Sequence, residues 1–364
     1  MPEELRESET VLTERLNVSR PTLEDVARRA GVSKSTVSRA INGEPRVRAA
    51  VAERIREAVD ELGYVPNQAA RSLVTRSLVT RRNNAVAVVV TEPQNRLFAD
   101  PYFDCHLRGI RQELVQQGAQ PVLLFIEEPD DYPRVVNFLG GGHVDGALLF
   151  SLRTDPLPAM VEHMGLPAIF GGRPAVGSGH RGHGYTYVDA DNRGGAREAV
   201  RHLVSLGRRH IGTITGPLNQ ASAIDRLDGY RDVLLDTPPW LIAEGDFTLR
   251  GGATAMSELL DRCPDLDAVF VASDLMASGA LRVLRERGRK VPEEVAVVGF
   301  DDLAPIAEAT EPPLTTVHQD IEDMGRLMAR LLFKQTPNEL ASRDGSHPPS
   351  SVVTPTRLVV RKSA

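Results

Sequence analysis

The sequence predicts a small all-α unit followed by a much larger α/β body with parallel sheets in two lobes. Between residues 21 and 65, apolar side chains recur with helical spacing on either side of glycines that end helices. From residue 84 onward, short and almost continuous apolar runs alternate with helical segments, a pattern typical of parallel sheets covered on both faces. The length of 364 residues also exceeds that of one typical domain.

The N-terminal unit begins with two short helices. The Thr22 hydroxyl can cap the first helix, and Asp25 follows in capping-box position. Gly31 ends this helix, and Ser33 is placed to cap a second one over residues 34–40. Two short helices joined at a glycine-containing turn form a helix-turn-helix, whose second helix enters the major groove of DNA.

A third helix and a linker complete this part of the chain. Apolar residues on one face of 51–62 predict a helix that closes over the first two, with Gly63 as its C-cap. Pro66 cannot continue that helix. In the linker, RSLVT at 71–75 is repeated at 76–80, which adds five residues.

The body contains about twice as many apolar runs as one parallel sheet needs, so two α/β lobes are expected. The runs predicted as buried strands are 85–90, 121–126, 144–150, 167–172, 210–215, 267–273 and 295–300.

LEDVARRAGVSKSTVSRAING followed by ELGYVPNQAARSL resembles the lactose-repressor/galactose-repressor (LacI/GalR) family of transcriptional regulators. The likeness continues through GPLNQASAIDRLDGY, FVASDLMASGAL, VAVVGFDD and PPLTTVHQD. It implies a body like the periplasmic sugar-binding proteins, in which the chain crosses between the lobes more than once. The expected parts are a disordered arm (1–19), a helix-turn-helix headpiece (20–65), a hinge helix with linker (66–83) and a body (84–364), with lobe 1 at about 84–206 and 320–348 and lobe 2 at about 207–319 and 349–364.

The charge of the chain is unevenly distributed: the predicted DNA-binding part is basic, and the body is acidic. The net charge is −6, but residues 20–82 hold thirteen Lys/Arg against seven Asp/Glu, a net of +6. Residues 1–19 carry −3, which leaves −9 for residues 83–364. A basic head favours local phosphate contact, and an acidic body limits non-specific binding elsewhere.

Base-reading side chains are expected near the start of the second helix. Lys34, Ser35 and Arg39 have suitable spacing and chemistry, because Lys and Arg donate to guanine O6 and N7. The resemblance implies that Lys34 and Ser35 are the specificity pair and that Arg39 reads a guanine. Hydroxyl and amide side chains are expected to bind phosphates; they are Thr22, Ser33, Thr36, Ser38 and Asn42.

The hinge is expected to act in the minor groove. Asn67 can cap a short helix from 68 to 74, and the resemblance implies that this helix folds only on the operator, beside its twin. Leu73 would then wedge into the central base step, with Ala70 and Arg71 beside it. The repeat offers Leu78 as a second candidate, but the distance of Leu73 from Tyr64 matches the family.

A carbohydrate site needs polar groups for hydroxyls and an aromatic side chain for the C–H face of the ring. The resemblance implies Arg226 as a forked donor, Asp301 and Asp191 as acceptors, and Phe247 as the stacking ring. Ser273 stands where many relatives have Asn. Glu92 and Phe98 are further candidates, although EPQNRLFADPYF follows the family pattern only loosely.

No sequence feature indicates an enzyme, a cofactor or a metal. GHRGHG lacks further ligands at zinc spacing, LGGGHVDG precedes a strand instead of opening a helix, and there is no P-loop or G-x-S-x-G motif. Two cysteines are too few for a disulfide framework. With no apolar run near 20 residues and no signal peptide, a cytoplasmic protein without a membrane partner is expected.

These features predict a homodimer that binds pseudo-palindromic double-stranded operator DNA and represses sugar-catabolic genes until a mono- or oligosaccharide releases it. A purine-type corepressor that strengthens DNA binding remains an alternative. A plain sugar-binding transport protein is disfavoured by the headpiece.

Overall fold

The computed structural model describes residues 21–41, 47–64, 83–92, 94–150, 156–174, 185–335 and 351–364. The chain forms two compact units, residues 1–81 and residues 82–364, and each is described by itself. The described parts confirm the predicted fold class, an all-α unit and a body of two parallel-sheet lobes.

The N-terminal unit contains helices α2 (Leu23–Ala30), α3 (Lys34–Ile41) and α4 (Ala49–Leu62). Thr22 and Asp25 form the predicted capping box at the start of α2, and Gly31 ends the helix with φ 65°. The Ser33 hydroxyl accepts from the Thr36 amide at 3.2 Å, so it caps α3. A small core of buried residues holds the three helices together: Val26, Ala27, Ala30, Val37, Ile55 and Ala58.

The first lobe of the body contains a six-stranded sheet in the order β11-β5-β4-β3-β1-β2, with every neighbouring pair parallel. Its strands are β1 (Ala85–Val90), β2 (Gln120–Phe125), β3 (Gly146–Phe150), β4 (Ala168–Gly171), β5 (Tyr187–Ala190) and β11 (Val352–Thr354).

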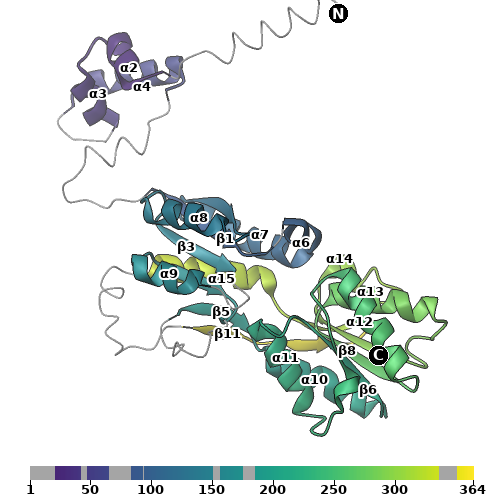
Figure 1. Cartoon of the computed structure of the whole chain (residues 1–364). Coiled ribbons are helices and arrows are strands. Elements are labelled where there is room, and N and C mark those ends of the chain that lie inside the picture. Colours follow the sequence, from purple (N-terminus) through teal and green to yellow (C-terminus); the bar gives the residue numbers. More distant parts are fainter. Residues whose placement is uncertain are drawn as a thin grey trace, which may run out of the picture. The chain divides into compact units, whose positions relative to one another are not determined.

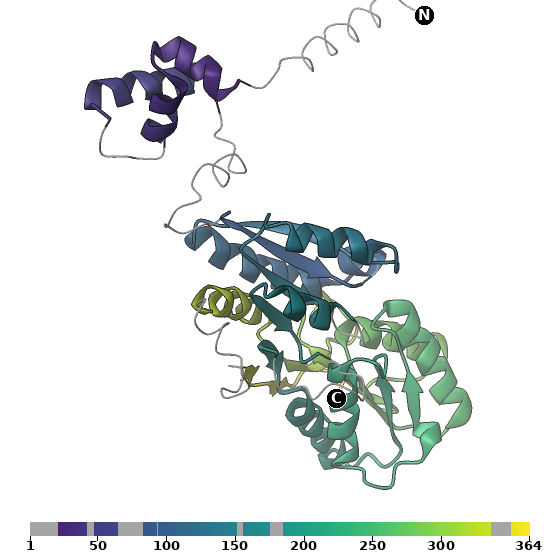
Figure 2. The same ribbon diagram turned by 60° about the vertical axis from the view of Figure 1, so that its left-hand side comes forward.

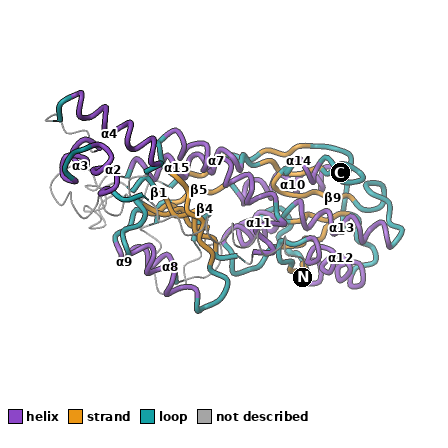
Figure 3. Tube along the Cα trace, turned by 90° about the horizontal axis from the view of Figure 1, so that it is seen from above, coloured by secondary structure: helices purple, strands orange, loops and turns teal. Residues whose placement is uncertain are grey.

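Helices cover both faces of this sheet, as Figure 3 shows for α7 and α15 on one side and α8 and α9 on the other. They are α7 (Pro101–Gln116), α15 (Ile321–Lys334), α8 (Asp131–Gly140) and α9 (Leu157–Met164); the short α6 (Gln94–Ala99) precedes α7. Both faces of β1 are apolar, since Val88 packs toward α7 and α15 while Val89 packs toward α8 and α9.

The second lobe contains a six-stranded sheet in the order β12-β10-β9-β8-β6-β7, in which only β12 is antiparallel to its neighbour. Its strands are β6 (Ile211–Thr215), β7 (Ile242–Glu244), β8 (Ala268–Val271), β9 (Ala296–Asp301), β10 (Thr315–His318) and β12 (Arg357–Val359).

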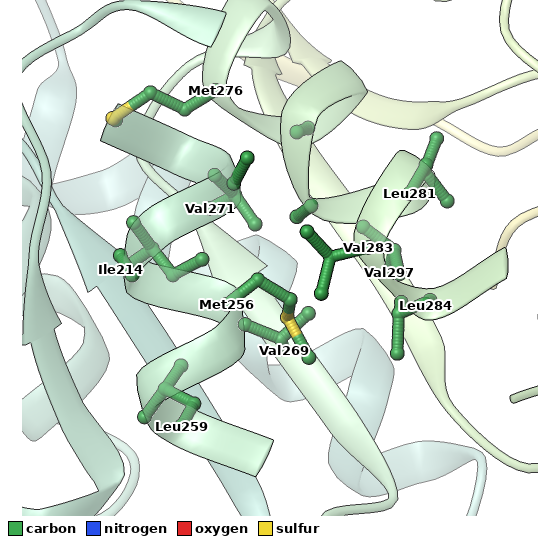
Figure 4. Packing of buried hydrophobic residues seen from close by; sticks show 14 of the residues in the cluster. Ile214, Met256, Leu259, Val269, Val271, Met276, Leu281, Val283, Leu284 and Val297 are labelled. Atoms are coloured by element: carbon green, nitrogen blue, oxygen red, sulfur yellow. The ribbon is translucent and has the colours of Figure 1, made fainter. Parts of the chain in front are cut away.

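This sheet also lies between two helical layers. One layer is α12 (Leu249–Arg262) and α13 (Asp274–Glu286), whose Met256, Leu259 and Leu284 pack on Val269 and Val271 (Figure 4). The other layer is α10 (Asn192–Ser205) and α11 (Ala221–Arg231), packed on the opposite face. A 3-10 turn, η1 (Pro239–Leu241), and the short α14 (Ala304–Ala307) complete the lobe.

The chain crosses between the lobes three times: after β5, after β10, and between β11 and β12 (Figures 1 and 2). The first crossing corrects the expected lobe boundary near residue 206. Helix α10 follows a first-lobe strand, but its Ala196, Val200 and Leu203 pack in the second-lobe core. The expected start of the last lobe-2 segment at 349 is also wrong, because β11 pairs with β5 in the first sheet.

Candidate functional site

A cavity lies between the lobes, where the strands of both sheets point their carboxyl ends, which is the usual place for a ligand in parallel α/β sheets. Most of the residues that line it have polar side chains. The lining residues are Arg96, Asp100, Tyr102, Gly172, Asp189, Asn192, Gln220, Ser222, Arg226, Phe247, Ser273, Asp301 and Gln319.

Arg226, on helix α11, is held rigidly by groups of its own lobe. Its Nε donates to Asn192 Oδ1 at 2.9 Å, and its Nη1 donates to the carbonyl of Ala272 at 2.5 Å. The guanidinium also lies 3.7 Å above the centre of the Phe300 ring. The predicted forked donor therefore lines the cavity with its orientation fixed before any ligand binds.

Asp301 ends strand β9 beside this arginine. Its Oδ1 accepts from Gln319 Nε2 at 2.6 Å and from Arg226 Nη1 at 3.4 Å. Burial raises its pKa to about 7, and Arg226 partly opposes that rise. The backbone has φ 112°, a conformation that is strained for any residue with a side chain. Fixed strain at the end of a strand is typical of a binding position.

A second buried carboxyl group, Asp274, lies behind Asp301. It accepts from the Leu303 amide at 2.8 Å and from the Thr316 hydroxyl at 2.5 Å. Burial, and next the charge of Asp301, raise its pKa well above the ordinary value. Asp274 thereby ties the loop after β9 to helix α13 and supports Asp301 from behind.

Phe247 supplies the predicted aromatic wall. The residue has φ 62°, and its amide contacts Met276 Sδ at 3.3 Å, so its backbone position is fixed. The ring covers Gly216 so closely that a Cβ there would lie 2.1 Å from Phe247 Cζ. The guanidinium of Arg96 lies 5.1 Å from the centre of the same ring.

Ser273 also lines the cavity, and its hydroxyl caps helix α13 by accepting from the Met276 amide at 3.3 Å. The predicted second-lobe residues Arg226, Phe247, Ser273 and Asp301 therefore all meet in one cavity.

Three other expectations for this site are wrong. Asp191 is exposed and caps α10, with its Oδ1 accepting from the Gly194 amide at 2.9 Å; its neighbours Asp189 and Asn192 line the cavity instead. Phe98, on the short helix α6, is 73% exposed and is not among the residues that line the cavity. Glu92 is fully buried behind the wall, where it binds Arg96 and Gln220.

Several lining residues were not predicted. In the first lobe, Asp100 caps α7 by accepting from the Tyr102 amide at 3.0 Å, and burial raises the pKa of both side chains. The sequence contains a signal that could have identified Asp100: Asp followed by Pro is a typical start of a helix. The others not predicted are Arg96, Gly172, Asp189, Asn192, Gln220, Ser222 and Gln319.

In the N-terminal unit, the predicted base-reading residues share helix α3. Lys34, Ser35 and Arg39 are exposed, and Arg39 Nε donates to the Ser35 carbonyl at 3.2 Å. Val37 is buried, as a core residue should be. The predicted phosphate-binding Thr22 and Ser33 are exposed, and Thr36 and Ser38 are half-buried.

Other predicted DNA contacts lie outside the described residues. These are Asn42 and the hinge residues Asn67, Ala70, Arg71 and Leu73, together with the alternative Leu78.

In the described ranges, no group of three or more His, Cys, Asp or Glu side chains is arranged to hold a metal ion. The helices of that part of the chain also include none with the length and apolar character needed to cross a membrane.

A cavity with fixed hydrogen-bonding groups and an aromatic wall, in a body joined to a helix-turn-helix unit, defines a ligand-responsive DNA-binding regulator. Residues 22–67 match the family described as bacterial regulatory proteins, lacI family, and residues 200–364 match the periplasmic binding protein-like domain. The chain is 48% identical over 349 residues to the HTH-type transcriptional regulator CelR of Thermobifida fusca, covering 94% of this chain and 98% of that protein. The chain belongs to the LacI family of transcriptional regulators.

A further relative and two solved structures are consistent with membership of this family. The Escherichia coli K12 repressor CytR is 32% identical over 319 residues, covering 86% of this chain and 89% of CytR. A CelR–cellobiose complex superposes with a TM-score of 0.71 at 45% identity, covering 95% and 100% of the two chains. A lac repressor dimer bound to operator and the anti-inducer ONPF gives 0.78 at 28% identity, covering 95% and 99%.

Proposed function

We propose that this regulator is a cytoplasmic, dimeric repressor that a β-linked glucose disaccharide of the cellobiose class releases from its operator. The observation that carries the proposal is the cavity: a fixed arginine fork, a carboxylate and an aromatic wall are the groups that bind sugar hydroxyls and the C–H face of a sugar ring. The similarity to the CelR–cellobiose complex, across nearly the whole of both chains, supports a disaccharide as the effector.

The residues have distinct roles in this proposal. The carboxylate of Asp301 accepts from sugar hydroxyls, the remaining N–H groups of Arg226 donate to them, and Phe247 packs against the ring. Ser273 stands where many relatives have Asn, so its shorter side chain contacts the sugar less extensively. The cavity is built from both lobes, so a sugar that touches both walls favours the closed arrangement.

Operator binding is assigned to the N-terminal unit. Lys34, Ser35 and Arg39 read base edges, and Thr22, Ser33, Thr36, Ser38 and Asn42 bind phosphates. Two copies of the unit are required for a pseudo-palindromic site, which is why the proposal includes a dimer. The dimer of the lac repressor on its operator supports this assembly.

In this proposal, sugar binding in the cavity and operator binding by the N-terminal unit are thermodynamically linked. Sugar-driven closure moves the lobes, the paired hinges separate, and operator affinity falls by a coupling free energy of typically about 1–3 kcal/mol. In the hinge, Leu73 is the minor-groove wedge. We therefore expect Leu73→Ala to weaken operator binding far more than Leu78→Ala, measured by fluorescence anisotropy; equal effects would show that the wedge is assigned to the wrong repeat.

The effector is tested with the full-length protein and a duplex that it selects from a random DNA library. Anisotropy is measured with cellobiose, with glucose and with guanine. Cellobiose is expected to lower operator affinity about 5- to 150-fold, with little effect of the other two compounds. Tighter operator binding with guanine and no response to sugars would contradict the proposal and favour a corepressor.

A further inference from the structure

Glu92, Arg96 and Gln220 connect the two lobes beside the cavity. Arg96 Nη1 lies 2.7 Å from Glu92 Oε2, and both residues belong to the first lobe. Gln220, at the N-cap position of helix α11 in the second lobe, donates from Nε2 to Glu92 Oε1 at 3.2 Å. A single buried carboxylate therefore holds one cavity-lining side chain from each lobe.

Each of these side chains has a buried polar atom that is left over. Arg96 Nε and Gln220 Oε1 have no hydrogen-bond partner among the described residues, and Arg96 Nη1 has only its ion-pair contact with Glu92. Arg96 is 9% exposed, Gln220 is 0% exposed, and both line the cavity. Because an unpaired buried polar group is costly, atoms of this kind at the wall of a cavity indicate the place of a ligand group.

The two atoms define the chemistry of that ligand group. Arg96 Nε–H can only donate a hydrogen bond, and Gln220 Oε1 can only accept one. A hydroxyl group does both, so one hydroxyl or two adjacent hydroxyls of a sugar match the pair. A ligand ammonium would satisfy only the glutamine oxygen, and a carboxylate only the arginine N–H.

We propose that Arg96 and Gln220, held by Glu92, form a hydroxyl-binding clasp that determines which sugars close the cleft. The proposal rests on the sugar-effector function and adds residues to that site. Arg96 comes from the segment EPQNRLFADPYF of the first lobe, and Gln220 comes from GPLNQASAIDRLDGY of the second lobe. Since the members of the clasp come from both lobes, a hydroxyl satisfies both atoms only while the lobes are together.

The guanidinium of Arg96 contacts an aromatic ring in each lobe. Its guanidinium carbon lies 5.7 Å from the centre of the Phe103 ring in its own lobe and 5.1 Å from that of Phe247 in the other. The arginine therefore packs against two aromatic rings as well as beside Glu92. This packing restricts the side chain, as a specificity contact requires.

The test compares cellobiose with its monodeoxy analogues by isothermal titration calorimetry on the full chain. The variants are Arg96→Lys, which keeps a cation beside Glu92 but removes the Nε–H, and Gln220→Met, which removes the acceptor at similar volume. Phe98→Ala is the matched control, because Phe98 is on the same helix as Arg96 but is 73% exposed.

For the wild type, removal of one particular hydroxyl is expected to weaken binding about 10- to 100-fold. Each of the two variants is expected to weaken cellobiose by a similar factor and to bind that deoxy analogue no worse than cellobiose. Phe98→Ala is expected to behave like the wild type. Thermal unfolding without sugar shows which variants are folded, and either variant alone is sufficient for the comparison.

Two results overturn the clasp, and they differ in what else they affect. Wild-type affinity for cellobiose in the folded variants would remove the clasp and leave the sugar-effector function intact. A wild-type protein that binds its selected duplex but neither cellobiose nor glucose would remove the effector function and the clasp together.

Discussion

The two walls of the effector cavity are built in different ways. On the second-lobe wall, Arg226 and Asp301 are bound to Asn192, Gln319 and Ala272, all within the same lobe. Across the cleft, Arg96 of the first lobe and Gln220 of the second lobe have a buried Nε and a buried oxygen, respectively, without a hydrogen-bond partner in the described part of the chain. The Arg226–Asp301 network of the second-lobe wall therefore does not depend on the first lobe, whereas Arg96 of the first-lobe wall and Gln220 opposite it are completed only by closure and by the ligand.

This difference assigns separate tasks to the walls. A preformed network gives sugar a rigid surface to meet, since its polar groups are already oriented. Contacts that form only across the cleft contribute free energy to closure, and in the proposed mechanism closure is the step that lowers operator affinity. The comparison therefore predicts which substitutions alter stability and which alter only the response.

The largest effect is expected from Arg226→Ala. The variant leaves Asp301 and the Ala272 carbonyl without their buried cationic partner, which costs about 3 kcal/mol of unfolding free energy. It also removes the sugar response, while a folded N-terminal unit still binds operator. Urea denaturation and operator anisotropy measure the two effects. A stable variant with a normal response would show that the second-lobe wall does not depend on this network.

The next effect is expected from Gly216→Ala, which places a methyl group where the Phe247 ring lies. The displaced ring is expected to lower sugar affinity about tenfold. In a Phe247→Ala background the same methyl group meets open space, so its effect is expected to disappear. Equal losses in both backgrounds, measured by calorimetry, would mean that the glycine acts elsewhere.

A smaller effect concerns pH. The pKa of Asp301 is about 7 in the folded protein, above its ordinary 3.8, so the folded state holds this proton more tightly than the unfolded chain. Its contribution to stability is complete below about pH 4 and is lost as the pH rises to about 7. Asp301→Asn removes this contribution, so the fall in melting temperature from pH 4 to pH 7 is expected to be shallower. An unchanged slope would assign the titration to other groups.

The smallest effect is expected from a surface contact across the cleft. Arg173 Nη2 lies 2.6 Å from Asp225 Oδ1, and the two side chains are 47% and 25% exposed. Because exposed ion pairs contribute little, Arg173→Ala is expected to change sugar affinity by less than about 1 kcal/mol. A loss as large as that from Gly216→Ala would show that closure depends on the rim more than on the buried clasp.

The same contrast shows how far the sequence could predict this protein. The apolar runs predicted the central strands of both sheets but not β5, β7, β10, β11 or β12. Thr22, Asp25, Gly31 and Gly63 predicted the headpiece helices, because such signals are local. The boundary at α10 was missed because an amphipathic helix has the same pattern whichever sheet it packs on.

The residues of the cavity also differ in how well the sequence predicted them. Arg226, Phe247, Ser273 and Asp301 of the second lobe line the cavity, and the resemblance located these four. Arg96 and Gln220 are 124 positions apart in sequence and are joined through Glu92, and the Arg96 segment follows the family pattern only loosely. Long-range contacts of this kind leave no periodic or spacing signal in the chain.

Hydrogen exchange with and without cellobiose tests the difference between the walls most directly. The amides of 94–106, at the first-lobe wall, are expected to exchange quickly without sugar and to gain strong protection with it. The amides of 223–231 and 299–303, at the second-lobe wall, are expected to be protected in both states. Equal gains at both walls, or a gain confined to the second lobe, would contradict a preformed wall that is completed by closure.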